Sequence, residues 1–161
     1  MQIEIRPIVE DDLDSIMTLL GEFAAFEKLD AMFEVTRERL HGPIFGEQAF
    51  VEGLVAVDGS DIVGYALFFP EFTSFRGKCG YFLEDLFVSD SYRGRGIGER
   101  LLRQVAKQAA ERGFERIDLV VLDWNKPAID FYKKLGAVGD EHGRQYRFTD
   151  AAFEYLATPE P

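Results

Sequence analysis

The sequence predicts an α/β fold in which one mixed, mostly antiparallel sheet has helices on both faces. The apolar segment 81–88 leads through a glycine-rich turn into a helical pattern that begins near Gly96. A strand after that helix implies a parallel crossover connection. Two other apolar segments, 54–57 and 62–69, flank a glycine-containing turn, which predicts an antiparallel hairpin. Because no repeat or linker-like stretch interrupts the chain, residues 1–161 are expected to form a single domain.

The composition narrows the class of protein. The 161 residues, of which 47% are hydrophobic and 15 are Phe, suit one domain with a sizeable core. No apolar run approaches the length of about 20 residues that spans a membrane, and the first residues lack the features of a secretory signal. A single cysteine, Cys79, fits a reducing cytoplasm, and two histidines without clustered cysteines offer no metal site. We therefore expect a cytoplasmic protein with no metal and no membrane partner.

The first half of the chain predicts a strand and two helices ahead of the hairpin. Ile3 and Ile5 alternate with polar residues in a short strand that ends at Pro7. A helix follows, and its core stripe consists of apolar residues at helical spacing: Leu13, Ile16, Met17, Leu20 and Phe23. The less regular segment 27–46 contains a short helix with Thr36 as its N-cap.

The formal net charge of −11 bears on the partners of the protein. So large an acidic excess argues against nucleic acid as a main partner. It favours cationic substrates, but it also serves plain solubility. The acids Glu27, Asp30 and Glu34 are likewise interpreted as a solvated face, with the wall of a cleft as the alternative.

The second half of the chain continues the alternation of strands and helices. Residues 70–77 are expected to form a loop that carries Phe72 and Phe75, ahead of a strand over 79–88. Gly113 suits the end of the long helix, and a buried strand over 117–122 follows.

The C-terminal part predicts a helix, a strand and a final helix. Pro127 stands at a first-turn position, and Gly136 closes that helix. A last strand is centred on residues 146–148, and Thr149 with Asp150 caps a short terminal helix.

The glycine-rich turn is the first candidate binding site. It reads Arg93-x-x-Gly96-x-Gly98, and each missing Cβ allows a ligand to approach the backbone. The helix that follows leaves unpaired N–H groups and the positive end of its dipole facing the turn, which suits a phosphate or pyrophosphate. The spacing fits neither the dinucleotide fingerprint nor a Walker loop. The alternative is an ordinary glycine-rich turn.

Two motifs together resemble a known family. Arg93-x-x-Gly96-x-Gly98 between a strand and a helix is similar to the acetyl-CoA pyrophosphate loop of the GNAT N-acetyltransferases. The motif Asn-x-x-Ala-Ile-x-Phe-Tyr-x-x-x-Gly-Ala over residues 125–137 resembles the second half of their acetyl-CoA site. Segments 83–94 and 124–133 look like the diamine/polyamine (spermidine/spermine) branch, which includes relatives acting on thialysine. The resemblance covers nearly the whole chain.

The resemblance implies an enzyme and its partners. It implies a single-domain GNAT fold and direct acetyl transfer, in a ternary complex, from acetyl-CoA to a primary amine of a small cationic acceptor. That acceptor is a diamine, a polyamine or a thialysine-like aminoalkyl amino acid. The resemblance also implies a homodimer in which the C-terminal strand, here Gln145–Phe148, contributes to the neighbouring subunit. The residues expected to bind acetyl-CoA are Leu86, Phe87, Val88, Arg93, Gly94, Arg95, Gly96, Ile97, Gly98, Asn125 and Tyr132.

Two carboxylates are the candidates for the amine side of the reaction. An aliphatic ammonium has a pKa near 10.4, so a base must take its proton. Glu84 is predicted to be that base, directly or through water, with its pKa raised by burial beside Phe82 and Phe87. The alternative is a surface-facing carboxylate. Asp85, the second expected substrate-binding residue, points to the opposite face if the strand is regular, whereas a β-bulge lets both acids serve the cleft.

The acid that protonates the leaving group and the identity of the acceptor each have more than one interpretation. Tyr132 is by default a core aromatic residue, and the resemblance makes it the acid that protonates the departing thiolate. Arg76 stands where the polyamine enzymes carry an acid, which weakens the case for a long polycation and offers a partner for an acceptor carboxylate. The rival functions are acetylation of another amine, in an aminoglycoside or a protein lysine, and a non-catalytic acetyl-CoA-binding module.

Overall fold

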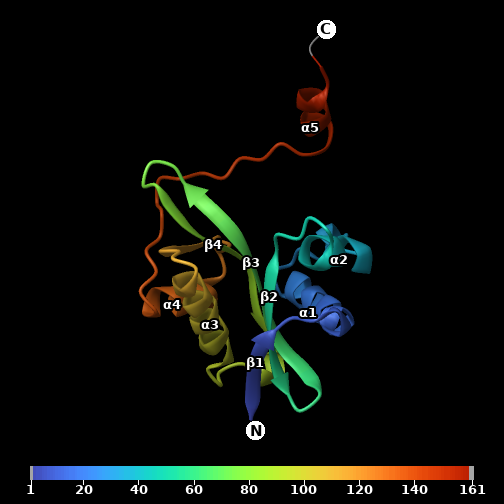
Figure 1. Ribbon diagram of the computed structural model, residues 1–161, viewed down its shortest axis with the longest axis vertical. Coiled ribbons are helices and arrows are strands. Elements are labelled where there is room, and N and C mark those ends of the chain that lie inside the picture. The colour runs from blue at the N-terminus through green and yellow to red at the C-terminus, as the bar shows by residue number, and fades with distance from the viewer. Residues whose placement is uncertain (1, 160–161) are drawn as a thin grey trace. The chain divides into compact units, whose positions relative to one another are not determined.

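A five-stranded sheet is the centre of the fold (Figure 1). The computed structural model describes residues 2–159, and the chain divides into two compact units between residues 125 and 126. The single domain expected over residues 1–161 stays a prediction. The strands found in residues 2–159 lie in the first unit: β1 (Ile3–Pro7), β2 (Glu52–Asp58), β3 (Asp61–Thr73), β4 (Lys78–Val88) and β5 (Arg116–Leu119).

The sheet is mixed and mostly antiparallel, as the sequence predicts. The strand order is β1-β2-β3-β4-β5, and among the described strands only the pair β4–β5 is parallel. The helices of the first unit are η1 (Glu10–Asp12), α1 (Leu13–Phe26), η2 (Asp30–Met32), α2 (Arg37–Phe45), η3 (Asp90–Tyr92) and α3 (Ile97–Glu111). Figure 1 shows α1 and α2 on one face of the sheet and α3 on the other. This arrangement confirms the predicted fold class.

Each face of the sheet is covered by an amphipathic helix. On α3 the buried residues recur every four positions, at Ile97, Leu101, Val105 and Ala109, and they pack on one face of the sheet. On the other face, buried residues of α1 and α2 form one cluster with side chains of β2, β3 and β4. Thr36 caps α2 through its hydroxyl, which accepts a hydrogen bond from the N–H of Arg39 at 3.2 Å, as predicted.

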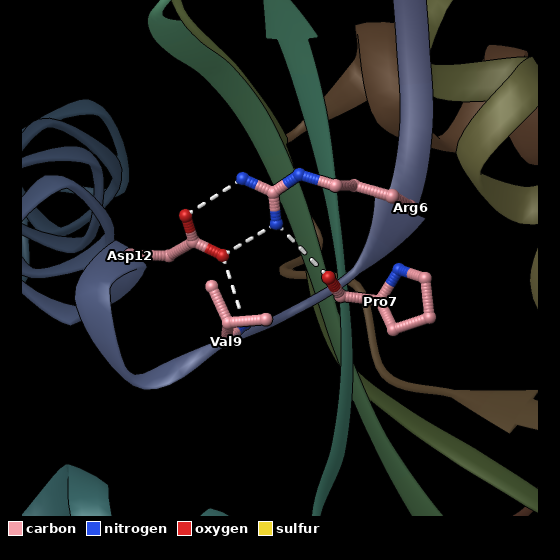
Figure 2. A network of polar contacts seen from close by, with 4 residues as sticks. All are labelled: Arg6, Pro7, Val9 and Asp12. Atoms are coloured by element: carbon pink, nitrogen blue, oxygen red, sulfur yellow. Dashed lines mark hydrogen bonds and ion pairs between the residues drawn. The ribbon is translucent and has the colours of Figure 1, made fainter.

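A partly buried ion pair connects the end of β1 to the start of α1. Figure 2 shows the guanidinium of Arg6 donating to both carboxylate oxygens of Asp12, at 2.7 and 2.9 Å. The N–H of Val9 also donates to Asp12, at 2.8 Å, and the side chain of Asp12 is almost fully buried. These bonds hold the pKa of Asp12 below its usual value, mainly through the Arg6 contact. The short turn between β1 and α1 therefore has a fixed geometry.

A β-bulge interrupts β4 at Glu84. Along β3, Leu67 lies opposite Asp85, but the next residue, Phe68, lies opposite Leu83. Glu84 is therefore the extra residue of a bulge. The sequence was compatible with either a regular strand or a bulge here. The bulge reverses the face to which the side chains after Glu84 point, compared with a regular strand.

The ends of two strands differ from the sequence-based expectation. The loop predicted over 70–77 is wrong in its first half, because β3 continues to Thr73 and only 74–77 form the turn. Pro70 is tolerated there because β2 pairs with β3 only as far as Phe68, so its missing N–H meets no partner strand. The strand predicted over 117–122 is also shorter, since β5 pairs with β4 only over residues 116–119.

The second unit contains two helices, α4 (Lys126–Lys134) and α5 (Asp150–Ala157). Both helices were predicted. The strand predicted around 146–148 is wrong for the isolated chain: residues 126–159 contain no strand, and Tyr146 is 84% exposed. A strand needs a hydrogen-bonded neighbour, and the described part of this unit offers none.

Candidate active site

The bulge in β4 places one of two adjacent carboxylates against a buried tyrosine. Asp85 is partly buried, and its Oδ2 accepts a hydrogen bond of 3.2 Å from the hydroxyl of Tyr65 on β3. Tyr65 itself is completely buried. Glu84 precedes Asp85 in the bulge and is exposed. The two acids thus have different surroundings although they are adjacent in the sequence.

Negative charge and burial act together on Asp85. Burial disfavours the charged form and, with the negative charges of Glu84 and Glu27, raises the pKa of Asp85 to about 7, while the hydrogen bond from Tyr65 opposes the rise. Burial and the neighbouring Asp85 raise the pKa of Tyr65 well above its usual value, so Tyr65 stays a neutral donor. Asp85 therefore titrates in the range in which a general base is useful.

The predicted burial of Glu84 is wrong. Glu84 was expected to be buried beside Phe82 and Phe87, but its side chain is exposed because it is the extra residue of the bulge. Asp85, on the regular strand after the bulge, is the one of these two carboxylates that is partly shielded from water. The catalytic role of Glu84 stays a prediction.

Glu27 is a third carboxylate at this place. It follows the last residue of α1, it is half-buried, and burial raises its pKa. Its charge acts on both Asp85 and Tyr65. The interpretation of Glu27 as part of a solvated face is therefore wrong, whereas Asp30 and Glu34 are exposed as expected.

The glycine loop has the geometry of an anion cradle. Gly94 and Gly96 have φ angles of +74° and +75°, and a Cβ at either position would meet no atom within 4 Å. Gly96 is the N-cap of α3, and no side chain caps the helix there. The open space, the left-handed backbone and the uncapped helix start fit a pyrophosphate.

The two arginines of the loop bond to the loop itself. The Nε of Arg93 donates to the carbonyl of Val88 at 3.0 Å, and its guanidinium lies 4.5 Å from the ring centre of Phe26 at the end of α1. The side chain of Arg95 donates to the carbonyl of Ser91 at 3.0 Å. These contacts shape the loop and connect it to α1, while the phosphate contacts expected of both arginines stay predictions.

The remaining predicted residues lie in different surroundings. Leu86, Phe87 and Val88 pair with β3, and within the described residues β5 pairs only with the part of β4 before the bulge. Asn125, the last residue of the first unit, is buried. Tyr132 is half-buried on α4 in the second unit, where its ring packs against that of Phe131. The roles assigned to Asn125 and Tyr132 stay predictions.

The described part of the chain contains neither a cluster of metal-binding side chains nor a helix that could span a membrane. Among residues 2–159, no group of three or more His, Cys, Asp or Glu side chains is arranged to hold a metal ion. Over the same residues, no helix combines the length and the apolar character needed to cross a membrane.

Comparison with known proteins agrees with this geometry. Residues 13–137 match the acetyltransferase (GNAT) family. The chain is 37% identical to a thialysine N-epsilon-acetyltransferase of Bos taurus, over 95% of this chain and 96% of that protein. It is 42% identical to an L-ornithine N5-acetyltransferase of Arabidopsis thaliana over a shorter stretch, 59% of this chain and 42% of that protein.

A solved structure confirms the fold over nearly the full length. An integron cassette protein from Vibrio cholerae superposes with a TM-score of 0.82 at 26% identity, with 99% of each chain covered. The bulged fourth strand and the glycine loop before α3 both lie within the residues that match this family of acetyltransferases, and the match extends over most of the chain. The chain belongs to the acetyltransferase (GNAT) family.

The cradle at Gly96 yields a binding prediction. Gly96→Val should weaken the binding of CoA at least about tenfold, because the added side chain fills the open space in front of α3. Isothermal titration of the folded variant with CoA measures this. Gly113→Val is the matched control, since Gly113 has a φ of +74° and equally open surroundings at the other end of α3. Equal affinity of the two variants would show that the loop at Gly96 is only structural.

Proposed function

We propose that the protein transfers the acetyl group of acetyl-CoA to a primary amine of a small acceptor that carries more than one charge. Thialysine-like aminoalkyl amino acids are the favoured acceptors, with diamines and polyamines next. The observation that carries the proposal is the group of three carboxylates, Glu27, Glu84 and Asp85, at the bulge of β4. The thialysine and ornithine acetyltransferases among the relatives support the same class of acceptor.

The carboxylates suit an ammonium group for electrostatic reasons. Exposed charges are screened within about 10 Å at 0.1 M salt, so the overall charge of the protein contributes little selectivity. A partly buried carboxylate interacts more strongly with a cation because less water lies between the charges. A cationic acceptor is therefore attracted most strongly at Asp85, where the charges of Glu27 and Glu84 also act.

The chemistry divides among the residues of the chain. Acetyl-CoA supplies the activated acetyl group as a thioester. A carboxylate at the bulge takes a proton from the acceptor ammonium, and backbone N–H groups of β4 after the bulge polarise the acetyl carbonyl. The glycine loop and the start of α3 hold the pyrophosphate. Tyr132 protonates the departing thiolate in this proposal, and Asn125 holds the pantetheine arm or the start of α4.

Arg76 does not fit the role of a partner for an acceptor carboxylate. It lies in the turn between β3 and β4, whereas Asp85 lies opposite Leu67, six residues before the end of β3 at Thr73. Six residues of strand span about 20 Å, at about 3.3 Å per residue. A small amino acid held at Asp85 is too short to reach the turn. With the acceptor held at Asp85, as proposed, Arg76 of the same chain is therefore not the partner of an acceptor carboxylate.

An acceptor panel tests the function. We expect kcat/KM for thialysine, ornithine and 1,4-diaminobutane to exceed that for butylamine at least about tenfold at low salt, because only the former carry a second charge for the acidic subsite. Release of free thiol from acetyl-CoA measures the rates. Equal rates for butylamine and the diamine would contradict an acidic subsite. Preference for an aminoglycoside or a basic peptide would identify that compound as the acceptor class instead. Thiol release that does not depend on any amine would favour a non-catalytic acetyl-CoA-binding module.

The leaving-group role of Tyr132 makes a second prediction. Tyr132→Phe should lower kcat about 100-fold, within the range of an acid catalyst, and leave the KM for acetyl-CoA within a few-fold. Steady-state kinetics with the best acceptor of the panel measure both values. Tyr155→Phe is the control, because Tyr155 is exposed on α5 in the same unit. If kcat of the Tyr132 variant stays within a few-fold, water or another acid protonates the thiolate.

The protein is also proposed to form a homodimer, as the resemblance to polyamine-type relatives implies. Tyr146 and Phe148 are 84% and 67% exposed in the segment that was expected to pair with a neighbour. Exposed aromatic residues in one segment suit an interface. We expect a dimer in sedimentation velocity at micromolar concentration, and a monomer for the double variant Tyr146→Ser with Phe148→Ser. A monomeric unmodified protein would rule the dimer out.

A further inference from the structure

Tyr65 is a buried titratable residue that the proposed chemistry does not yet use. Its side chain is completely buried in β3, and its hydroxyl donates to Oδ2 of Asp85 at 3.2 Å. A buried hydroxyl without a partner costs free energy, so this contact fixes the position of both groups. The ring of Tyr65 lies 6.4 Å from that of Phe87, directly opposite on β4, which holds the tyrosine in place.

We propose that Tyr65 is a positioning residue that holds Asp85 as the carboxylate that takes the proton from the acceptor ammonium. This inference deepens the proposed function and rests on it. The hydroxyl of Tyr65 occupies Oδ2 of Asp85, so the proton of the acceptor passes to Oδ1. One N–H bond of the acceptor breaks, an O–H bond forms on Asp85, and the neutral amine keeps the electron pair that attacks the acetyl carbonyl.

The surroundings of Asp85 favour it over Glu84 as the base. The groups that act on Asp85 are Glu84 in the same strand, Tyr65 on β3 and Glu27 at the end of α1. Burial and the negative charges of Glu84 and Glu27 favour the protonated form of Asp85, whereas the hydrogen bond from Tyr65 favours the charged form. Together they set the pKa of Asp85 to about 7. Glu84 is exposed and contributes its negative charge. A base with a pKa near the working pH is the most efficient one.

These contacts predict the direction in which each substitution moves the pKa of Asp85. The hydrogen bond from Tyr65 stabilises the charged form of Asp85, so its removal in Tyr65→Phe raises the pKa of Asp85. The negative charge of Glu84 destabilises that form, so Glu84→Gln lowers the pKa of Asp85. The acidic limb of the pH profile of kcat/KM therefore moves to higher pH in the first variant and to lower pH in the second.

The test compares two chemically identical changes. Tyr65→Phe should shift the acidic limb upward by on the order of one pH unit, so that kcat/KM falls about fivefold at pH 7 and recovers toward pH 9. Tyr81→Phe is the matched control: Tyr81 is equally buried, but its hydroxyl donates to Glu52 at 3.0 Å, and we expect no shift of the limb. Asp85→Asn should abolish the limb, whereas Glu84→Gln should keep it.

A second measurement needs no acceptor. The ¹³C signal of the Asp85 carboxyl group, followed by NMR, should titrate near pH 7 in the unmodified protein and at higher pH in Tyr65→Phe. An unchanged midpoint overturns the positioning role of Tyr65. A shifted midpoint with an unchanged pH profile overturns Asp85 as the base, and so does loss of the limb in Glu84→Gln. A shifted midpoint in a protein that acetylates no amine overturns the proposed function and, with it, the proton transfer.

Discussion

The bulge at Glu84 is the constraint on which the arrangement of the site depends. Without the extra residue, Asp85 and Phe82 would not both lie on the face of the sheet that carries Tyr65 and Leu67. The bulge also coincides with the end of the β4–β5 pairing, since β5 pairs only with residues 80–83. One local irregularity thus brings a carboxylate to a buried hydroxyl and frees the strand that leads into the glycine loop.

The glycine loop depends on a second constraint, which is the left-handed backbone at Gly94 and Gly96. Only glycine adopts these φ angles without strain, and the same residues leave the space in front of α3 open. Arg93 connects this loop to α1 through its contact with Phe26. Since Glu27 follows Phe26 directly, the position of the third carboxylate is coupled to the position of the loop.

The sequence predicts those parts of the structure that local patterns determine. The hairpin, α1, α3 and the cap at Thr36 follow from periodicity and turn chemistry, and the structure confirms them. Tyr65 was not identified as a site residue, and Glu27 was considered only as an alternative wall of a cleft, because their importance comes from strand register and from the direction in which α1 ends. The length of β5, and whether residues 146–148 form a strand, depend on partner strands that a single sequence does not reveal. Tyr65 lies in the continuous apolar run 62–69, which is buried on both faces of the sheet, so the sequence offers no alternation that assigns its side chain to one face.

The acids at the bulge oppose folding, because burial and the neighbouring negative charges disfavour the charged form of Asp85, and burial disfavours that of Glu27. The native state lowers this cost by keeping Asp85 protonated until about pH 7. Between the usual pKa of an aspartate and pH 7 the folded protein binds more protons than the unfolded chain, so this group makes stability fall as the pH rises. A bound ammonium offsets the repulsion while Asp85 is charged. Transfer of the proton then leaves a neutral amine beside a neutral acid, and a partly buried site favours that pair over two separated charges. The arrangement that costs stability in the free protein is therefore the one that assists loss of a proton from a group with a pKa near 10.4.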